Sequence, residues 1–159
     1  LKTLQAPLKA KYQENPEAAV ITLKASGELG SEQLVCSVET VKALVEAGLH
    51  PATGGDGTQA CSGDMLLQAL VACAGVTLAA VATALEIDLK GVHAEGDLDF
   101  RGTLGVDKKV PVGFRDIRLS FDLDTDADGE KIATLMKLTE RYCVVYQTLI
   151  SPPPVTVSY

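Results

Sequence analysis

Residues 65–85, MLLQALVACAGVTLAAVATAL, contain no charged side chain, and this stretch decides how the chain folds. Twenty-one uncharged residues are long enough to cross a bilayer as a helix. The flanking residues Asp64 and Glu86 are acidic, however, whereas a cytoplasmic anchor carries basic flanks. A helix that is apolar on every side is also expected at the centre of a globular fold. We therefore predict a buried central helix here and no membrane span.

The segments before this helix have the patterns of strands and a loop. Residues 21–25 alternate between apolar and polar side chains, and residues 34–38 do the same, so each predicts a strand. Residues 40–47 end before Gly48 and predict a short helix. Residues 50–63 are rich in glycine and small polar side chains, which indicates a loop.

The segments after the central helix complete the pattern. Residues 90–101 and 117–123 alternate and predict two half-exposed strands. Residues 128–149 have apolar side chains at helical spacing and end at Ser151-Pro-Pro-Pro154, and residues 155–159 predict a last short strand. Strands and helices in this order, without regular βαβ units, predict an α+β fold with antiparallel sheet.

Composition sets limits on the class of protein. A chain of 159 residues and 16.7 kDa suits a single domain over its whole length. The net charge of −7, the absence of a basic cluster and an aromatic content of 4% disfavour a nucleic-acid surface. Residues 1–10 lack the apolar core of a signal peptide, and four cysteines do not make a disulfide scaffold. We expect a cytoplasmic protein with reduced thiols.

Two motifs for bound groups are incomplete, and we expect no cofactor. The run Gly54–Gly57 lacks the Lys-Ser/Thr ending of a phosphate loop. Residues 124–129 match the opening of a calcium loop, but Leu135 stands where a bidentate Glu is needed. An acidic turn that caps the following helix explains this run better.

Cys73 and Cys143 are the first candidates for chemistry, because each lies in a helix expected at the centre of the fold. The two sulfurs could approach each other, but buried free cysteines are usually small core residues, and both interpretations stay open. Cys61 precedes the central helix, where the helix dipole favours a thiolate, so it is an alternative reactive thiol. His50, Cys61, Asp64 and Cys73 would be the donors of a metal cluster, although their spacing matches no compact motif.

These motifs, taken in order, resemble the OsmC/Ohr family of hydroperoxide-reducing proteins. The shared pattern is a Gly-rich loop, an acidic residue before an Ala-rich helix with an embedded Cys, and a late Cys followed by Thr-Leu. The residues that carry the resemblance are Gly54-Gly55, Asp64 to Cys73, Asp97 to Gly102, Val112 to Ile117, Glu140 to Cys143 and Thr148-Leu149. The resemblance covers residues 20–159.

The resemblance implies an OsmC-like fold in which antiparallel sheets wrap around two central helices in an intertwined homodimer, with active sites at the subunit interface. It implies a thiol-dependent peroxidase that acts on organic hydroperoxides. Cys73 would attack the peroxide, Cys143 would resolve the product into a disulfide, and an external dithiol would reduce the pair. Asp64 stands where the family has a Glu that orients the cation beside the reactive thiol.

One departure from the family pattern concerns that cation. The family's organic-hydroperoxide members hold the thiolate with an Arg from the N-terminal half, and no Arg precedes Arg101 here. Lys24, Lys42 and Arg141 are the candidates to replace it. Val144 stands where the family often has Pro, so we expect the second helix to continue past the thiol. The missing Arg favours an alternative function, which is to bind or modify a small apolar molecule in the interface pocket of the same fold.

Overall fold

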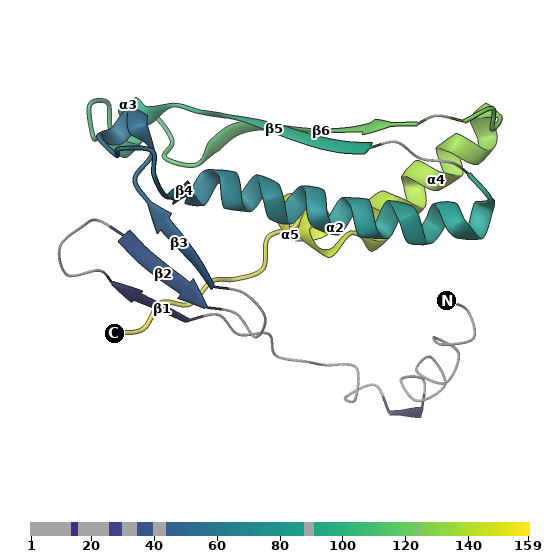
Figure 1. Ribbon diagram of the computed structural model, residues 1–159, viewed down its shortest axis with the longest axis horizontal. Helices are drawn as coiled ribbons and strands as arrows, with labels where there is room; N and C mark the ends of the chain where they lie inside the picture. Colours follow the sequence, from purple (N-terminus) through teal and green to yellow (C-terminus); the bar gives the residue numbers. More distant parts are fainter. Residues whose placement is uncertain (1–13, 16–25, 30–34, 40–43, 88–90, 124) are drawn as a thin grey trace. The chain divides into compact units, whose positions relative to one another are not determined.

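The structure is a computed structural model that describes residues 14–15, 26–29, 35–39, 44–87, 91–123 and 125–159 (Figure 1). It divides into two compact units, Leu1–Gly48 and Leu49–Tyr159. The strand expected over residues 21–25 lies outside the described residues, as do Lys24 and Lys42. That the whole chain forms a single domain stays a prediction.

The N-terminal unit contains three antiparallel strands, β1 (Ser26–Leu29), β2 (Val35–Glu39) and β3 (Leu44–Gly48). Their register pairs Leu29 with Cys36 and Cys36 with Ala47. The strand expected near residues 34–38 is confirmed as β2. The helix expected over 40–47 is wrong in its described part, because residues 44–48 form β3. A helix of two turns is marginal in isolation, whereas β3 gains a complete ladder of hydrogen bonds along β2.

The second unit holds all the described helices of two turns or more. Its elements in chain order are η2 (Pro51–Thr53), β4 (Ala60–Cys61), α2 (Ser62–Leu85), β5 (Gly91–Leu98), α3 (Phe100–Thr103), β6 (Phe114–Asp122), α4 (Gly129–Tyr142) and α5 (Val144–Ile150). The predicted central helix is therefore confirmed as α2, which starts three residues earlier than expected. The expected loop over 50–63 contains η2 and β4 and ends where α2 begins.

The core of this unit lies where α2 meets α4. Leu78, Ala82 and Ile87 from α2 and its end are buried together with Leu135 of α4. Leu78 and Leu135 are exposed by 1% or less, and each fully buried leucine stabilises the fold by about 1.5–3 kcal/mol. By length and composition α2 would also suit a membrane span. In the single chain only Leu70, Ala74, Leu78 and Ala82 of α2 are buried, and this stripe packs on α4. Burial of α2 on every side and the absence of a membrane span stay predictions.

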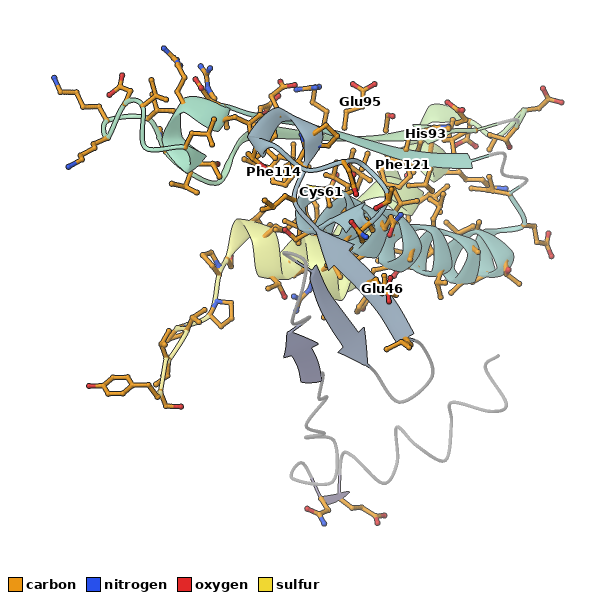
Figure 2. The ribbon with its side chains drawn as sticks, turned by 60° about the vertical axis from the view of Figure 1, so that its left-hand side comes forward. Glu46, Cys61, His93, Glu95, Phe114 and Phe121 are labelled. Carbon is orange, nitrogen blue, oxygen red and sulfur yellow. The ribbon has the colours of Figure 1, made fainter. Side chains whose placement is uncertain are left out.

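Strands β5 and β6 form an antiparallel hairpin that lies along α2 in Figure 1, and α2 contacts β5. The expected alternation is confirmed, because Val92 and Phe121 pack against the core while His93 is exposed. Figure 2 shows Glu95 pointing away from α2. Gly96 is required where it stands, since a Cβ there would lie 2.5 Å from the ring of Phe114. The strand expected to reach Arg101 ends at Leu98, and Arg101 belongs to α3.

Two expectations about the C-terminal part are wrong. The helix expected over 128–149 is broken, because Cys143 has an extended backbone (φ −74°, ψ 105°) between α4 and α5. Residues 155–159 form no strand among the described residues, and Val155 and Val157 are each 85% exposed. A strand requires a partner for its ladder, and alternation alone does not supply one. The acidic turn before α4 caps that helix as expected, since Asp128 Oδ1 accepts a hydrogen bond from the Lys131 amide at 2.8 Å.

Candidate functional site

Cys73 and Cys143 lie side by side, and their thiol groups are within hydrogen-bonding reach of each other. Cys73 is contributed by the middle of α2, and Cys143 by the junction of α4 and α5. Both are free thiols. Cys73 is partly exposed, whereas Cys143 is only 1% exposed. A reagent from solution therefore reaches Cys73 first.

The break at Cys143 supplies the hydrogen-bond donors of the site. In a continuous helix each amide donates to the carbonyl four residues earlier. At the start of α5 the amides of Val144 and Val145 instead lie close enough to the sulfur of Cys73 to lower its pKa. The amides of Tyr146 and Val145 act in the same direction on Cys143. The first turn of α5 thus presents its amides to the thiol pair.

These contacts give the two thiols opposite acidities. Burial raises the pKa of Cys73, but the amides of Val145 and Val144 and the thiol of Cys143 stabilise its thiolate, so its pKa lies below the ordinary thiol value. Burial raises the pKa of Cys143, and the negative charge developing on Cys73 raises it further. The arrangement favours one thiolate, on Cys73, beside one neutral thiol.

Thr77 adds a donor from the same helix as Cys73. Its hydroxyl donates to the carbonyl oxygen of Cys73, one turn earlier, at 2.8 Å. The same hydroxyl can rotate its one proton toward the sulfur instead, which lowers the pKa of the Cys73 thiol. Among the residues that the structure describes, the donors that stabilise this thiolate are neutral groups. Neutral donors act over a short range, so their effect depends on keeping this geometry.

Asp64 and Cys61 lie at the start of α2, apart from Cys73 of the same chain. Asp64 is exposed in the first turn, nine residues before Cys73, which is about 13 Å along the helix axis and on the opposite face. Cys61 is the residue before α2, about 18 Å along the axis, which is too far for a disulfide with Cys73 of the same chain. Catalytic roles for Asp64 and Cys61 stay predictions.

The interactions recorded for the described residues do not link His50 or Arg141 to the thiol pair. Nδ1 of His50 accepts a hydrogen bond from the Ala52 amide at 3.0 Å, and its ring stacks on Phe100 with 4.8 Å between centroids. Arg141 is exposed in the last turn of α4. Within the described ranges, no three His, Cys, Asp or Glu side chains form a group that could hold a metal ion.

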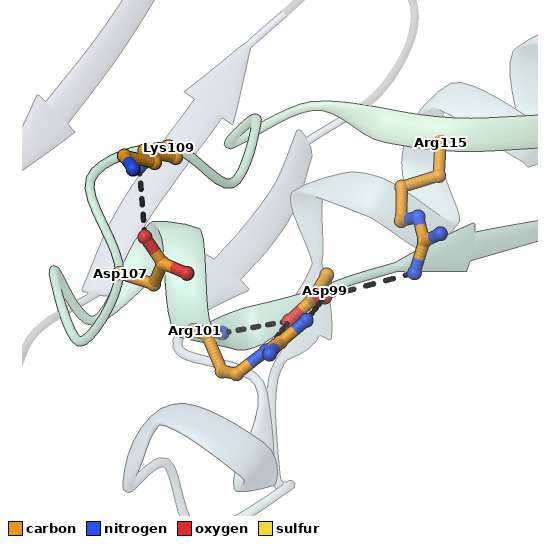
Figure 3. Close-up of polar contacts among 5 residues, drawn as sticks. All are labelled: Asp99, Arg101, Asp107, Lys109 and Arg115. Carbon is orange, nitrogen blue, oxygen red and sulfur yellow. Dashed lines mark hydrogen bonds and ion pairs between the residues drawn. The ribbon is translucent and has the colours of Figure 1, made fainter.

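The first arginine of the chain is held by a carboxylate at the end of the β5–β6 hairpin. Figure 3 shows Arg101 donating to Asp99, with distances of 2.9 Å from Nε and 2.6 Å from Nη2. This hydrogen bonding lowers the pKa of Asp99 to about 2. Arg115 approaches the same carboxylate at 3.6 Å. Arg118 pairs with Asp97 and Asp116 on the outer surface of the hairpin.

A cavity of about 680 Å³ lies between α2, β6 and the two C-terminal helices, and neither Cys73 nor Cys143 is among its lining residues. Leu70 lies one turn from Cys73 and Tyr146 one turn from Cys143, and both line it. The remaining lining residues are mainly apolar: Leu66, Gly113, Phe114, Arg115, Asp116, Ile117, Leu119, Phe121, Glu140, Leu149 and Ile150. The cavity suits a molecule with an apolar chain.

A family model described as OsmC-like protein matches residues 55–158, about two thirds of the chain, and this range includes both cysteines of the pair. The chain belongs to the OsmC-like protein family. The resemblance seen in the sequence is therefore confirmed. No curated protein matches the chain.

Solved structures support the OsmC-like fold. An OsmC-like protein from Mycoplasma pneumoniae is similar with a TM-score of 0.66 and 16% identity, over 83% of this chain and 89% of that one. An organic hydroperoxide resistance protein from Elizabethkingia anophelis gives 0.64 and 14%, over 84% and 91%. The organic hydroperoxide resistance protein OsmC from Legionella pneumophila gives 0.61 and 15%, over 83% and 91%. At these identities the likeness shows the α+β fold alone.

Several residues of this OsmC-like site were missed by sequence reasoning. Thr77 follows Cys73 by four residues, and that spacing could have suggested a hydrogen bond along the helix. The amides of Val144, Val145 and Tyr146 have no signal in the sequence, because they become donors only when the helix breaks at Cys143.

Proposed function

We propose that this OsmC-like protein is a thiol-dependent peroxidase that reduces organic hydroperoxides through Cys73 and Cys143. The observation that carries the proposal is the contact between a partly exposed thiol of lowered pKa and a buried thiol of raised pKa. A thiolate is the form that attacks peroxides, and a neighbouring neutral thiol is what a disulfide-forming cycle needs. Two structurally similar proteins are described as organic hydroperoxide resistance proteins.

The proposed cycle uses the two sulfurs in turn. The Cys73 thiolate attacks the terminal oxygen of the hydroperoxide, the O–O bond breaks, and the alkoxide leaves and takes up a proton as the alcohol. Cys73 is then a sulfenic acid. Cys143 loses its proton and attacks the Cys73 sulfur, a disulfide forms, and hydroxide leaves with that proton as water. An external dithiol reduces the disulfide and restores both thiols.

The opposite pKa shifts of the two thiols would act at two steps. Donors at Cys73 favour the attacking thiolate before the peroxide arrives. The raised pKa of Cys143 keeps its proton in place until the sulfenic acid has formed, so that the proton is available for the departing hydroxide. The mainly apolar cavity, whose lining includes Leu70 and Tyr146 one turn from the two cysteines, supports an alkyl hydroperoxide as the substrate class.

We also propose that the protein works as a homodimer in the cytoplasm, where free thiols persist. Several large apolar side chains on α2, α4 and α5 are exposed in the single chain. They include Val76 (74% exposed), Tyr142 (64%) and Val144 (71%). Large apolar side chains exposed on several elements would be covered in an interface between subunits.

Single substitutions at the two cysteines test the proposed function. Cys73→Ser should abolish peroxide turnover with a dithiol reductant, because no attacking thiolate remains. Cys143→Ser should allow one round of oxidation that stops at the sulfenic acid of Cys73, detected with a dimedone-type probe. Turnover retained in Cys73→Ser would contradict the proposal.

The cavity favours a second function, in which an OsmC-like protein binds or modifies a small apolar molecule without reducing peroxide. A native mass spectrum of the purified protein checks this function directly. A bound apolar compound, together with both thiols left reduced after peroxide treatment, would favour it over the peroxidase.

A further inference from the structure

The break between α4 and α5 leaves the carbonyls of Glu140, Arg141 and Tyr142 without their usual amide donors, and the carbonyl of Glu140 has a replacement. In an unbroken helix the amide of Val144 would donate to the carbonyl of Glu140. Here the Val144 amide makes no bond to that carbonyl and lies near the sulfur of Cys73, whose pKa it lowers. The carbonyl of Glu140 instead accepts a hydrogen bond from Nε2 of Gln147 at 2.8 Å. A side chain has taken the place of the amide that the thiol uses.

We propose that Gln147 is a positioning residue, which holds the chain open at Cys143 so that the amides of the next turn face the two sulfurs. The inference rests on the proposed function, because it assigns Gln147 to the support of that thiol pair. Gln147 touches neither sulfur in this account and acts through the backbone.

The backbone around the break shows how little separates the open arrangement from a continuous helix. The Cys143 amide donates to the Thr139 carbonyl at 2.9 Å, and the Gln147 amide donates to the Cys143 carbonyl at 2.9 Å. Helical hydrogen bonding therefore continues on both sides of the break. The extended backbone of Cys143 turns the amides of Val144, Val145 and Tyr146 away from the carbonyls that they would reach in a continuous helix. Without the side chain of Gln147, the Glu140 carbonyl would bond to water or would regain the Val144 amide, and the second outcome would merge α4 with α5.

The first test replaces Gln147 with methionine, which keeps the length and helix preference of the side chain but has no donor. We expect the rate of Cys73 alkylation by iodoacetamide at pH 7 to fall about fivefold, which is the effect of losing one hydrogen bond. Thr148→Val is the matched control. It removes the neighbouring hydrogen bond from the Thr148 hydroxyl to the Val144 carbonyl (2.8 Å), which lies within α5 and does not span the break. This control should keep the rate of the parent protein.

The second test adds Val144→Pro, because proline has no amide hydrogen to return to Glu140. Proline is favoured in the first turn of a helix, and the extended backbone of Cys143 suits the residue before it. In the parent protein this change removes one donor from Cys73 and should slow alkylation. In the Gln147→Met background, Val144→Pro should speed alkylation of Cys73. The proline keeps α4 and α5 apart where the side chain of Gln147 no longer does so.

Opposite signs of the Val144→Pro effect in the two backgrounds are the expected result. An unchanged alkylation rate in Gln147→Met, or equal slowing by Val144→Pro in both backgrounds, would overturn the role of Gln147. Alkylation needs no peroxide, so the test is independent of turnover. If the peroxidase proposal is wrong, the parent protein will fail to reduce peroxide while this alkylation pattern persists.

Discussion

At the scale of single residues, Cys73 and Cys143 differ because of the donors around them and their burial. The two side chains are chemically identical, but Cys73 is hydrogen-bonded by Val144 and Val145 and is partly exposed. Cys143 is buried and faces the charge that develops on Cys73. The surrounding groups therefore select which sulfur is the nucleophile. The sequence alone left a core role and a catalytic role open for both.

The acidity of the two thiols predicts the order in which they react as pH rises. Because the pKa of Cys73 is lowered, its thiolate and its alkylation rate should rise below the pH at which a free thiol titrates. Because the pKa of Cys143 is raised, its alkylation should begin only above that pH. Iodoacetamide labelling across a pH series, read by peptide mass spectrometry, measures both. Labelling of Cys143 before Cys73 would contradict the assignment.

The Thr77 hydroxyl supports the Cys73 thiolate, and removing it should weaken that support. Thr77→Val keeps the shape of the side chain, and we expect alkylation of Cys73 at pH 7 to slow roughly fivefold. Thr83→Val is the matched control, because the Thr83 hydroxyl makes the same kind of bond to the Ala79 carbonyl (2.7 Å) in the same helix. Equal effects of the two variants would mean that Thr77 acts only on the helix.

At the scale of elements, the sequence pattern predicted those helices and strands whose apolar spacing fits one type of secondary structure. Helix α2 and strands β5 and β6 were predicted because long apolar runs and strict alternation each have one simple explanation. The strand β3 was missed because pairing with β2 outweighs local preference. The break at Cys143 was missed because the apolar spacing continues through it. The structure shows the break in the extended backbone of Cys143 and in the hydrogen bond from Gln147 to the Glu140 carbonyl.

The packing of α2 on α4 should depend on Leu135, which is fully buried among Leu78, Ala82 and Ile87. Leu135→Ala would leave a cavity and should lower the free energy of unfolding by about 2–5 kcal/mol. Val112→Ala, at a position 62% exposed, should change it by no more than about 0.5 kcal/mol. Urea denaturation followed by circular dichroism compares the two variants. A loss below about 1 kcal/mol for Leu135→Ala would contradict the core described here.

At the scale of the whole molecule, the OsmC-like fold followed from the order of motifs in the sequence, whereas the assembly remains a proposal. The exposed face of α2 carries Val76, and we expect this residue to lie in the homodimer interface. Val76→Asp would bury a charge there and should convert dimers to monomers in analytical ultracentrifugation. Val106→Asp, at a loop position of similar exposure (72%), should leave the dimer intact. A monomeric parent protein would contradict this proposal.

The central claim is that Cys73 and Cys143 form one redox pair, and peptide mass mapping tests it most directly. The reduced protein is treated with one equivalent of an alkyl hydroperoxide, quenched with an alkylating agent and digested. We predict rapid and nearly complete formation of a Cys73–Cys143 disulfide, with Cys61 recovered as a free thiol. Recovery of Cys73 and Cys143 as free thiols, or a disulfide that joins Cys73 to another cysteine, would contradict the account.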